Sequence, residues 1–267
     1  MVTVNDVLGR LLSTAPIELK MGFDNVGLLV GRSDSIVTKI LVSLDITNDV
    51  ITEALEMGAE LIVSHHPLFF SLKSVTSDDI TGNKILRLMS GGISAICMHT
   101  NLDAAIEGTS AALARAAGIC DTHGKAELLA EEGRLSDGTA YSYGRVGCLS
   151  SAQPLRRYLE LLKIALKTDG LRYYDAGKDV FHVAVVSGSG GDYLDKAAAK
   201  GCDTFITADI KYDVFLEAKE LGINLIDGGH FCTENLVTDV LAEGINAAIP
   251  ETTAVISKCH RDAIRFF

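Results

Sequence analysis

Hydrophobic positions along this chain fall into short continuous apolar runs, separated by stretches in which apolar residues recur every three or four positions. The runs predict buried strands and the spaced stretches predict amphipathic helices. In the first part of the chain we predict helices over residues 1–15, 47–58, 85–89 and 109–117, and strands over residues 39–44, 61–64 and 93–98. Residues 23–31 are predicted as a loop that enters a short apolar strand. Strands that alternate with helices and are apolar throughout predict an α/β fold with parallel sheets covered on both faces.

The second part of the chain repeats this alternation after a polar stretch. Residues 121–138 are polar and contain glycine, which predicts a linker, so we divide the chain into domains over residues 1–125 and 126–267. Beyond the linker we predict strands over residues 140–149, 171–175, 183–186, 204–207 and 224–227. The predicted helices cover residues 154–167, a segment ending near residue 201, and residues 214–221 and 234–242.

The two parts also resemble each other, which suggests an internal duplication. Aligning Gly58 with Gly201 places His66 opposite Asp209, just past a strand in both copies. Ordinary alternation of strands and helices could produce part of this match. If the duplication holds, two similar three-layer α/β/α halves share one site at the carboxyl ends of their strands, where open α/β sheets bind ligands.

Composition narrows the class of protein. The chain has 267 residues, 48% of them hydrophobic and 22% charged, which excludes a mainly disordered chain. Its formal net charge of −11 disfavours nucleic acid as a partner, and no apolar run approaches the length of a membrane span. The six cysteines form no CxxC pair, and the first twenty residues lack a signal-peptide pattern. We therefore expect a cytoplasmic protein with reduced thiols.

Candidate metal ligands follow three of the predicted strands. His65 and His66 come directly after the strand over residues 61–64, where two imidazoles can point to two nearby ions; two surface histidines in a loop are the alternative. His99 and Asp103 follow the next strand. Asp103 can offer an oxygen ligand and His99 can ligate or orient a ligand, although side chains of this kind also serve ordinary turns.

The third segment contains His230 and Glu234, four residues apart after the strand over residues 224–227. We expect Glu234 near the first turn of the last helix, where a carboxylate also interacts favourably with the helix dipole. One carboxylate can bridge two cations. Together the three segments offer a nitrogen and oxygen ligand set suited to Zn or Fe, with Mn or Co also possible.

Five segments carry a resemblance to a known family. They are FDNVGLLVG, SHHPLFF, MHTNLDAAIEGTS, ADIKYD and GGHFCTE, in order over residues 20–245. They resemble the dinuclear metal-centre family of GTP cyclohydrolase 1 type 2 homologues, also called NGG-interacting-factor-three-like proteins. The resemblance implies two metal ions per chain, two intertwined α/β/α domains and a ring-shaped homohexamer. The five ligands it implies are His65, His66, Asp103, His230 and Glu234.

In that family pattern His66 and Asp103 hold one ion, His65 and His230 hold the other, and Glu234 bridges. The chain departs from many members at Phe231 and Cys232, where they have Tyr and Ala, and neither change removes a ligand.

These features predict a metal-dependent hydrolase that acts through a metal-activated water on a small molecule, such as a nucleotide or another phosphoester. We assign His99 as the catalytic proton shuttle. GTP ring opening is the activity that the resemblance names. The alternative is a non-catalytic protein that stores or delivers metal or binds a partner. The glycine-rich loop over residues 187–191 could cradle a phosphate, but close backbone packing explains it better.

Overall fold

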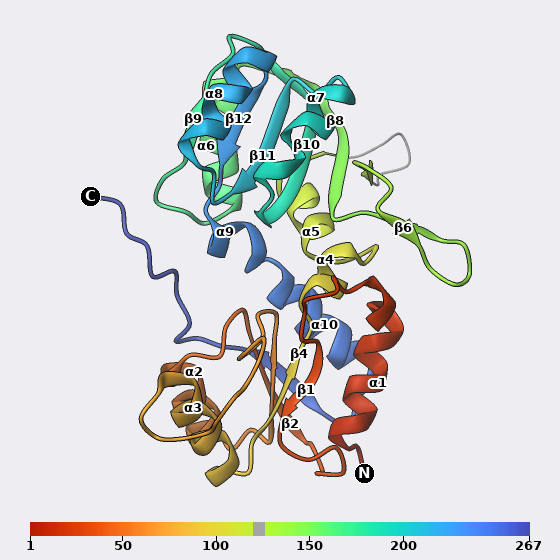
Figure 1. Ribbon diagram of the computed structural model, residues 1–267, viewed down its shortest axis with the longest axis vertical. Helices are drawn as coiled ribbons and strands as arrows, with labels where there is room; N and C mark the ends of the chain where they lie inside the picture. The colour runs from red at the N-terminus through yellow and green to blue at the C-terminus, as the bar shows by residue number, and fades with distance from the viewer. Residues whose placement is uncertain (120–125) are drawn as a thin grey trace. The chain divides into compact units, whose positions relative to one another are not determined.

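The computed structural model describes residues 1–119 and 126–267, which form two compact units (Figure 1). Unit 1 consists of Met1–Leu102 and Val237–Arg261, and unit 2 consists of Asp103–Leu236 and Asp262–Phe267. The chain therefore passes between the units three times. The boundary that we expected near residue 125 falls inside unit 2, and residues 121–125 of the expected linker lie outside the described residues.

Unit 1 is built around a five-stranded sheet in the order β1-β4-β3-β2-β13. Its strands are β1 (Gly27–Val30), β2 (Lys39–Ser43), β3 (Leu61–Ser64), β4 (Ser94–Cys97) and β13 (Thr253–Ile256). Its helices are α1 (Val4–Thr14), η1 (Ile17–Leu19), α2 (Asn48–Met57), α3 (Ile80–Ser90) and α10 (Val237–Ala248), and α4 (Thr100–Ala104) leads into unit 2. The sequence analysis missed β13, which pairs in parallel with β2.

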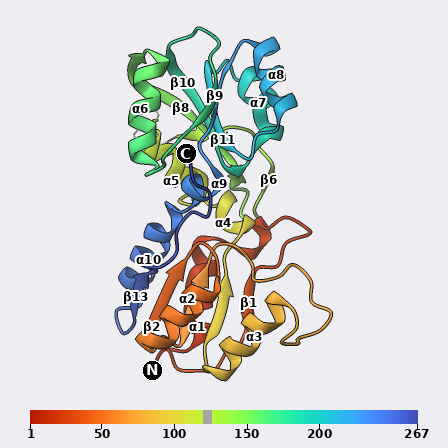
Figure 2. The same cartoon turned by 90° about the vertical axis from the view of Figure 1, so that its left-hand side faces the viewer.

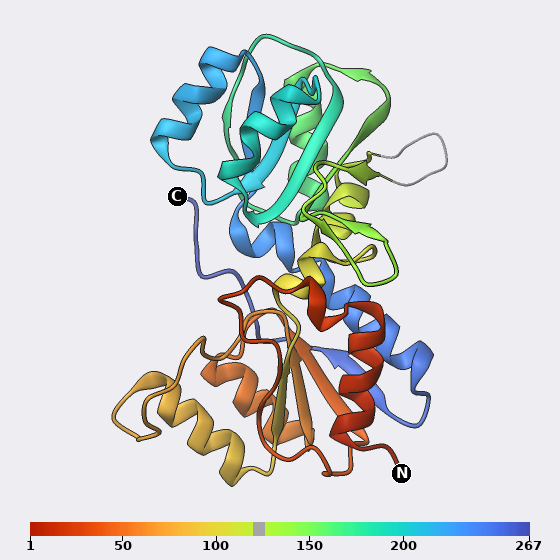
Figure 3. The ribbon, with the colours of Figure 1, turned by 45° about the vertical axis from the view of Figure 1, so that its right-hand side comes forward.

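Helices cover both faces of the unit 1 sheet. Figure 3 shows α2 and α3 on one face and α1 and α10 on the other. On the first face, Leu41 and Ile62 of the sheet pack with Val50 and Ile51 of α2 in one buried cluster. Helix α2 is capped at both ends of the predicted range, because the Thr47 side chain accepts the N–H of Val50 and the chain turns at Gly58 with φ of 65°.

Unit 2 contains a six-stranded sheet in the order β5-β8-β10-β11-β12-β9 and a separate two-stranded hairpin, β6-β7. The strands are β5 (Glu127–Leu128), β6 (Gly133–Arg134), β7 (Ala140–Tyr141), β8 (Gly144–Gln153), β9 (Arg172–Tyr174), β10 (Val180–Ser189), β11 (Thr204–Ala208) and β12 (Asn224–Asp227). The helices are α5 (Thr109–Ala116), α6 (Leu155–Ala165), η2 (Gly191–Tyr193), α7 (Leu194–Ala199), α8 (Tyr212–Leu221) and α9 (His230–Glu234).

Unit 2 also has three layers, with α7 and α8 on one face of the sheet and α6 on the other (Figure 2). Successive residues of β10 divide between the two faces. Val183 and Val185 belong to the buried cluster that includes residues of α5, α6 and α9, whereas Ala184 and Val186 pack with residues of α7 and α8. The expected covering of a sheet on both faces is thus present in both units.

Strand direction differs from the prediction, because both sheets are mixed. The central strands β2, β3 and β4 are parallel, as are β10, β11 and β12, but β1, β8 and β9 run antiparallel to their neighbours. A continuous apolar run reports burial on both faces and carries no information about direction. The strand expected over residues 140–149 is also broken, because the Ser142 side chain accepts the N–H groups of Ala130 and Gly144 between β7 and β8.

The expected last helix over residues 234–242 is two helices. Glu234 closes the short helix α9, and α10 begins at Val237. The expectation that Glu234 lies in the first turn of the last helix is therefore wrong. Its helix is the one that His230 begins, so the two residues lie one turn apart on the same helix.

One detail recurs at the start of the central strands of both units. The Glu60 carboxylate accepts the N–H of Lys39, and the Asp203 carboxylate accepts the N–H of His182. Glu60 and Asp203 immediately precede β3 and β11, the middle strands of the two parallel triplets. This correspondence is what an internal repeat would produce, and the duplication itself stays a prediction.

Candidate metal centre

Residues His65 and His66 are held at the end of β3 by backbone hydrogen bonds. The His65 N–H donates to the Ser43 carbonyl at 3.3 Å and the His66 N–H donates to the Leu44 carbonyl at 2.9 Å. The Ser64 hydroxyl donates to the His66 carbonyl at 2.8 Å. These bonds fix the backbone just past the strand, so both imidazoles start from defined positions.

The Nδ1 atom of each of these histidines meets an oxygen. His65 Nδ1 lies 2.8 Å from the Met98 carbonyl oxygen, and His66 Nδ1 lies 2.8 Å from Asp45 Oδ1. An acceptor at Nδ1 places the proton on that nitrogen and leaves the lone pair on Nε2. A histidine oriented in this way by a carbonyl or carboxylate is typical of metal ligands in proteins.

The carboxylate of Asp45 is itself oriented by a second histidine. Asp45 Oδ2 lies 2.9 Å from His260 Nε2, in addition to the contact of Oδ1 with His66. Burial works to raise the pKa of Asp45, but the hydrogen bonds from His260 and His66 outweigh it and hold that pKa well below its usual range. Asp45 therefore stays ionised and holds the His66 ring through Nδ1.

His99 has a partner of the same kind. Its Nδ1 lies 2.8 Å from Oδ1 of Asp24, whose side chain is fully buried. The Asp24 carboxylate also accepts two hydrogen bonds from Thr100, one from its N–H at 2.9 Å and one from its hydroxyl. Burial would raise the pKa of Asp24, but the hydrogen bonds from His99 and Thr100 hold it well below its usual range.

The three histidines gather into one cluster in unit 1. The ring centroids of His65 and His66 are 5.0 Å apart, those of His65 and His99 are 5.2 Å apart, and those of His66 and His99 are 5.6 Å apart. One ligand nitrogen from each lies within 4.8 Å of the others, so the cluster could hold a metal ion. This geometry allows His99 to act as a ligand as well as the proton shuttle that we predicted from the sequence.

In unit 2, the helix α9 brings His230 and Glu234 together. His230 Nε2 lies 3.0 Å from Glu234 Oε2, and His230 Nδ1 lies 2.7 Å from Asp209 Oδ2. Glu234 raises the pKa of His230 to about 9, with help from Asp209 and against the effect of burial. His230 is therefore protonated near neutral pH, and a cation that bound its Nε2 would have to displace that proton.

Asp103 is a second candidate carboxylate ligand in unit 2, in addition to Glu234. A carboxylate oxygen of Asp103 lies within 4.8 Å of one from Glu234. The Thr109 hydroxyl donates to Asp103 Oδ1 at 2.5 Å, which orients the carboxylate. Glu234 thus lies close to both Asp103 and His230, as a bridging carboxylate would.

The loop over residues 187–191 packs closely against Thr207, Thr233 and Glu234. The N–H groups of Gly188 and Gly190 donate to the hydroxyls of Thr233 and Thr207, so both amides are engaged by side chains. Gly188 has φ of +61°, and a Cβ there would lie 2.0 Å from Glu234 Oε1. Close packing, which we favoured over phosphate binding, is therefore the role of these glycines, and Gly188 makes room for the Glu234 carboxylate.

Sequence analysis did not assign the residues that orient the histidines. Asp24 and Asp209 lie within segments that carry the family resemblance, so a signal for them was present in FDNVGLLVG and ADIKYD. Asp45 and His260 lie outside those five segments. No local pattern marks them, because the contact that joins them spans 215 positions of the chain.

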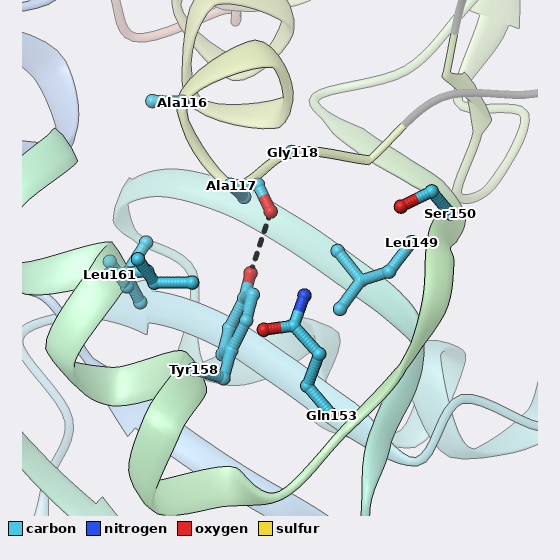
Figure 4. A pocket seen from close by; sticks show the side chains of 9 residues that line it. Ala116, Ala117, Gly118, Leu149, Ser150, Gln153, Tyr158 and Leu161 are labelled. Carbon is cyan, nitrogen blue, oxygen red and sulfur yellow. Dashed lines mark hydrogen bonds between the residues drawn. The ribbon is translucent and has the colours of Figure 1, made fainter.

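A separate cavity of about 230 Å³ lies in unit 2 between the end of α5, the end of β8 and helix α6 (Figure 4). Tyr158 and Gln153 line it, and the Tyr158 hydroxyl donates to the Ala117 carbonyl at 2.9 Å across it. None of the predicted metal ligands is among its lining residues.

Comparison with known proteins identifies the family. A profile of the Duf34/NIF3 (NGG1p interacting factor 3) family matches residues 2–263. The chain belongs to this family. A Duf34/NIF3 relative from Clostridium perfringens, named GTP cyclohydrolase 1 type 2 homolog, is 36% identical over 98% of this chain and 99% of its own. The relative from Helicobacter pylori, named GTP cyclohydrolase 1 type 2, is 31% identical over 91% of each chain.

Solved structures support the same Duf34/NIF3 fold. The crystal structure of Staphylococcus aureus hypothetical protein SA1388 matches with a TM-score of 0.89 and 26% identity, over 99% of both chains. A Bacillus cereus protein related to NIF3 matches with a TM-score of 0.88 over 100% of this chain and 99% of its own. The Bacillus cereus protein is 23% identical in sequence to this chain, so this match supports the fold and nothing further. Among the described residues, no helix is both long and apolar enough to cross a membrane.

Proposed function

We propose that this protein holds two divalent transition-metal ions and hydrolyses a nucleotide or another phosphoester-like substrate with a metal-activated water. The observation that carries the proposal is the orientation of the histidines. His65, His66, His99 and His230 each have Nδ1 on an oxygen acceptor, and a carboxylate lies within reach of His230 Nε2. Imidazoles and carboxylates in this arrangement suit Zn or Fe, with Mn or Co as further candidates.

The predicted ligands divide between the two units, and we propose that they act on one shared centre. Unit 1 would supply His65 and His66, and unit 2 would supply Asp103, His230 and Glu234. Glu234 would bridge the two ions, a role supported within unit 2 by its closeness to both Asp103 and His230. Two such ions, when bound, lower the pKa of a water molecule and so supply a nucleophile near neutral pH.

The chain's own residues would position this chemistry and move a proton. Asp45 and Asp24 hold His66 and His99 in place from behind. His99 would take up or release a proton at Nε2, because its Nδ1 is held by Oδ1 of the buried Asp24 carboxylate. The names of the relatives support a nucleotide such as GTP as one candidate substrate.

Metal content and turnover test this function together. Purified protein, loaded with Zn or Fe, should contain about two ions per chain by elemental analysis. It should hydrolyse at least one member of a panel of nucleotides and phosphoesters, and His66→Ala should lose that activity. His182→Ala is the matched control, because His182 contacts the Gly201 carbonyl in unit 2 and no predicted ligand.

Two results would contradict the proposal in different ways. Fewer than one ion per chain after loading would exclude the metal centre. Full occupancy without turnover on the whole panel would instead favour the alternative, a non-catalytic protein that stores or delivers metal or binds a partner. The ring-shaped homohexamer implied by the family resemblance is a further proposal, and sedimentation or light scattering at several concentrations would test it.

A further inference from the structure

Two phenylalanine rings lie exposed beside the histidine cluster of unit 1. Phe23 is 66% exposed and Phe70 is 55% exposed, and their ring centroids are 6.0 Å apart at an interplanar angle of 54°. Apolar rings that contact each other and face solvent lose the free energy that burial would provide. A surface pair of this kind therefore points to something that covers it.

The pair borders the candidate metal centre directly. The centroid of the Phe70 ring lies 5.9 Å from that of His99, with the two planes tilted by 60°. His99 in turn lies within the cluster formed with His65 and His66. A ring bound on Phe23 and Phe70 would therefore lie next to the histidines without occupying their ligand nitrogens.

Hydrogen bonds fix both rings relative to His99. The Asn25 side-chain amide donates to the Phe69 carbonyl at 2.9 Å, which joins the loop that carries Phe23 to the loop that carries Phe70. Asp24, between Phe23 and Asn25, accepts hydrogen bonds from His99 and Thr100. The loop that carries Phe23 is thus tied to His99 through Asp24 and to the loop that carries Phe70 through Asn25, so the backbone positions of both rings are set by the site.

We propose that Phe23 and Phe70 form a stacking platform for the planar ring of a nucleotide substrate. This inference rests on the proposed function and adds the residues that would select the substrate. Every nucleobase offers a flat face to an aromatic side chain, and each such stacking contact contributes about 5- to 150-fold in affinity. A nucleotide stacked here places its ring on the platform and its polar remainder toward the histidines.

The absence of tryptophan from the chain allows a direct optical test. Phe70→Trp introduces a single tryptophan at the platform, and its fluorescence reports stacking without any need for turnover. Phe181→Trp is the matched control, because Phe181 is 42% exposed and lies on β10 of unit 2. The probes are GTP, ATP, CTP and UTP, with inorganic tripolyphosphate as the probe that has the charge but no ring.

At least one nucleotide should quench Phe70→Trp fluorescence with saturation, whereas tripolyphosphate should not, and Phe181→Trp should not respond. Adding Phe23→Ala should weaken the binding about 5- to 150-fold, and Phe23→Tyr should restore it, since tyrosine keeps the aromatic face. Phe23→Trp in the natural Phe70 background repeats the test from the other ring if Phe70→Trp folds poorly.

Metal content measured on the same samples separates this inference from the proposed function. Full metal occupancy with no quenching by any of the four nucleotides in either tryptophan variant would overturn the platform and leave the metal centre standing. Saturable quenching without bound metal would support the platform and contradict the metal centre. A fluorescence shift that depends on protein concentration and not on nucleotide would show that a second copy covers the rings, and would overturn the platform.

Discussion

Replacing Gly188 with alanine tests whether the observed position of Glu234 is the one that binds metal. The new Cβ would lie 2.0 Å from Glu234 Oε1 and 2.9 Å from its Cδ, well inside van der Waals contact. The Glu234 side chain is flexible and can rotate away, so the carboxylate rather than the backbone should move. A carboxylate displaced from its position close to Asp103 and His230 can no longer share a metal centre with them.

The change has two separable costs. Gly188 has φ of +61°, and a residue with a Cβ pays about 1–2 kcal/mol for that conformation. Gly222→Ala pays the same backbone cost, because its φ is +64°, but nothing lies within 4 Å of its new Cβ. Both variants should therefore lose similar stability, and only Gly188→Ala should also lose metal affinity. Disturbing the surroundings of a metal ligand typically costs 10- to 100-fold in affinity, and we expect at least that much.

Thermal unfolding and chelator competition measure the two costs on the same samples. The two variants should melt within a few degrees of each other in the metal-free state. In the competition assay Gly188→Ala should release Zn at a chelator concentration at least tenfold lower than either Gly222→Ala or the unmodified protein. Equal metal affinity in Gly188→Ala and Gly222→Ala would show that Glu234 does not bind metal from the position seen here.

Three further changes test the residues around the histidines. Asp45→Asn removes the negative charge that orients His66, so we expect Zn affinity to fall about 10- to 100-fold in chelator competition, and an unchanged affinity would exclude a supporting role. His99→Ala should keep the metal and lose about 10²–10⁴-fold in turnover if His99 carries a proton, whereas a drop in metal content would identify it as a ligand. Folding lowers the pKa of Asp24. The ionised carboxylate therefore stabilises the folded state at pH values above its unfolded pKa of about 3.9, and this stabilisation is lost as the pH falls through the folded pKa. Asp24→Asn should consequently be less stable than the unmodified protein near pH 7, with a difference in denaturant unfolding that shrinks below about pH 4; a constant difference would contradict this assignment.

Sequence patterns predicted the central strands and most helices well, because the spacing of apolar residues and the residues that cap helices are local features of the chain. The run over residues 61–64 is a strand as expected, and α2 lies within the predicted range 47–58, with Thr47 and Gly58 as its caps. Strand direction was not predictable from such runs, which is why the antiparallel direction of β1 was not foreseen. The short strand β13 was missed because its pairing with β2 is a contact between the two ends of unit 1.

The candidate ligands were visible in the sequence because each follows a strand, and strand ends meet at one edge of a sheet. The residues that orient them were not visible as such. Asp24 lies 75 positions from His99, and the contact between them depends on the folded path of the chain. The position of Glu234 was misjudged because a break at residues 235–236 cannot be told from a continuous helix by hydrophobic spacing alone.

Unit 1 is made of two segments that flank most of unit 2 in the sequence, and this order affects how the chain can fold while it is synthesised. Most of unit 2 is one uninterrupted stretch, Asp103–Leu236, whereas unit 1 needs the late segment Val237–Arg261 to supply α10 and β13. A ribosome delivers the chain from its amino end, and domains usually fold in that order. Here the segment made first must wait for β13 before the edge of its sheet is paired, while unit 2 can fold ahead of it. His260, which contacts the Asp45 carboxylate behind His66, lies in the same late segment, so the histidine cluster is completed only after Asp103–Leu236 has been synthesised.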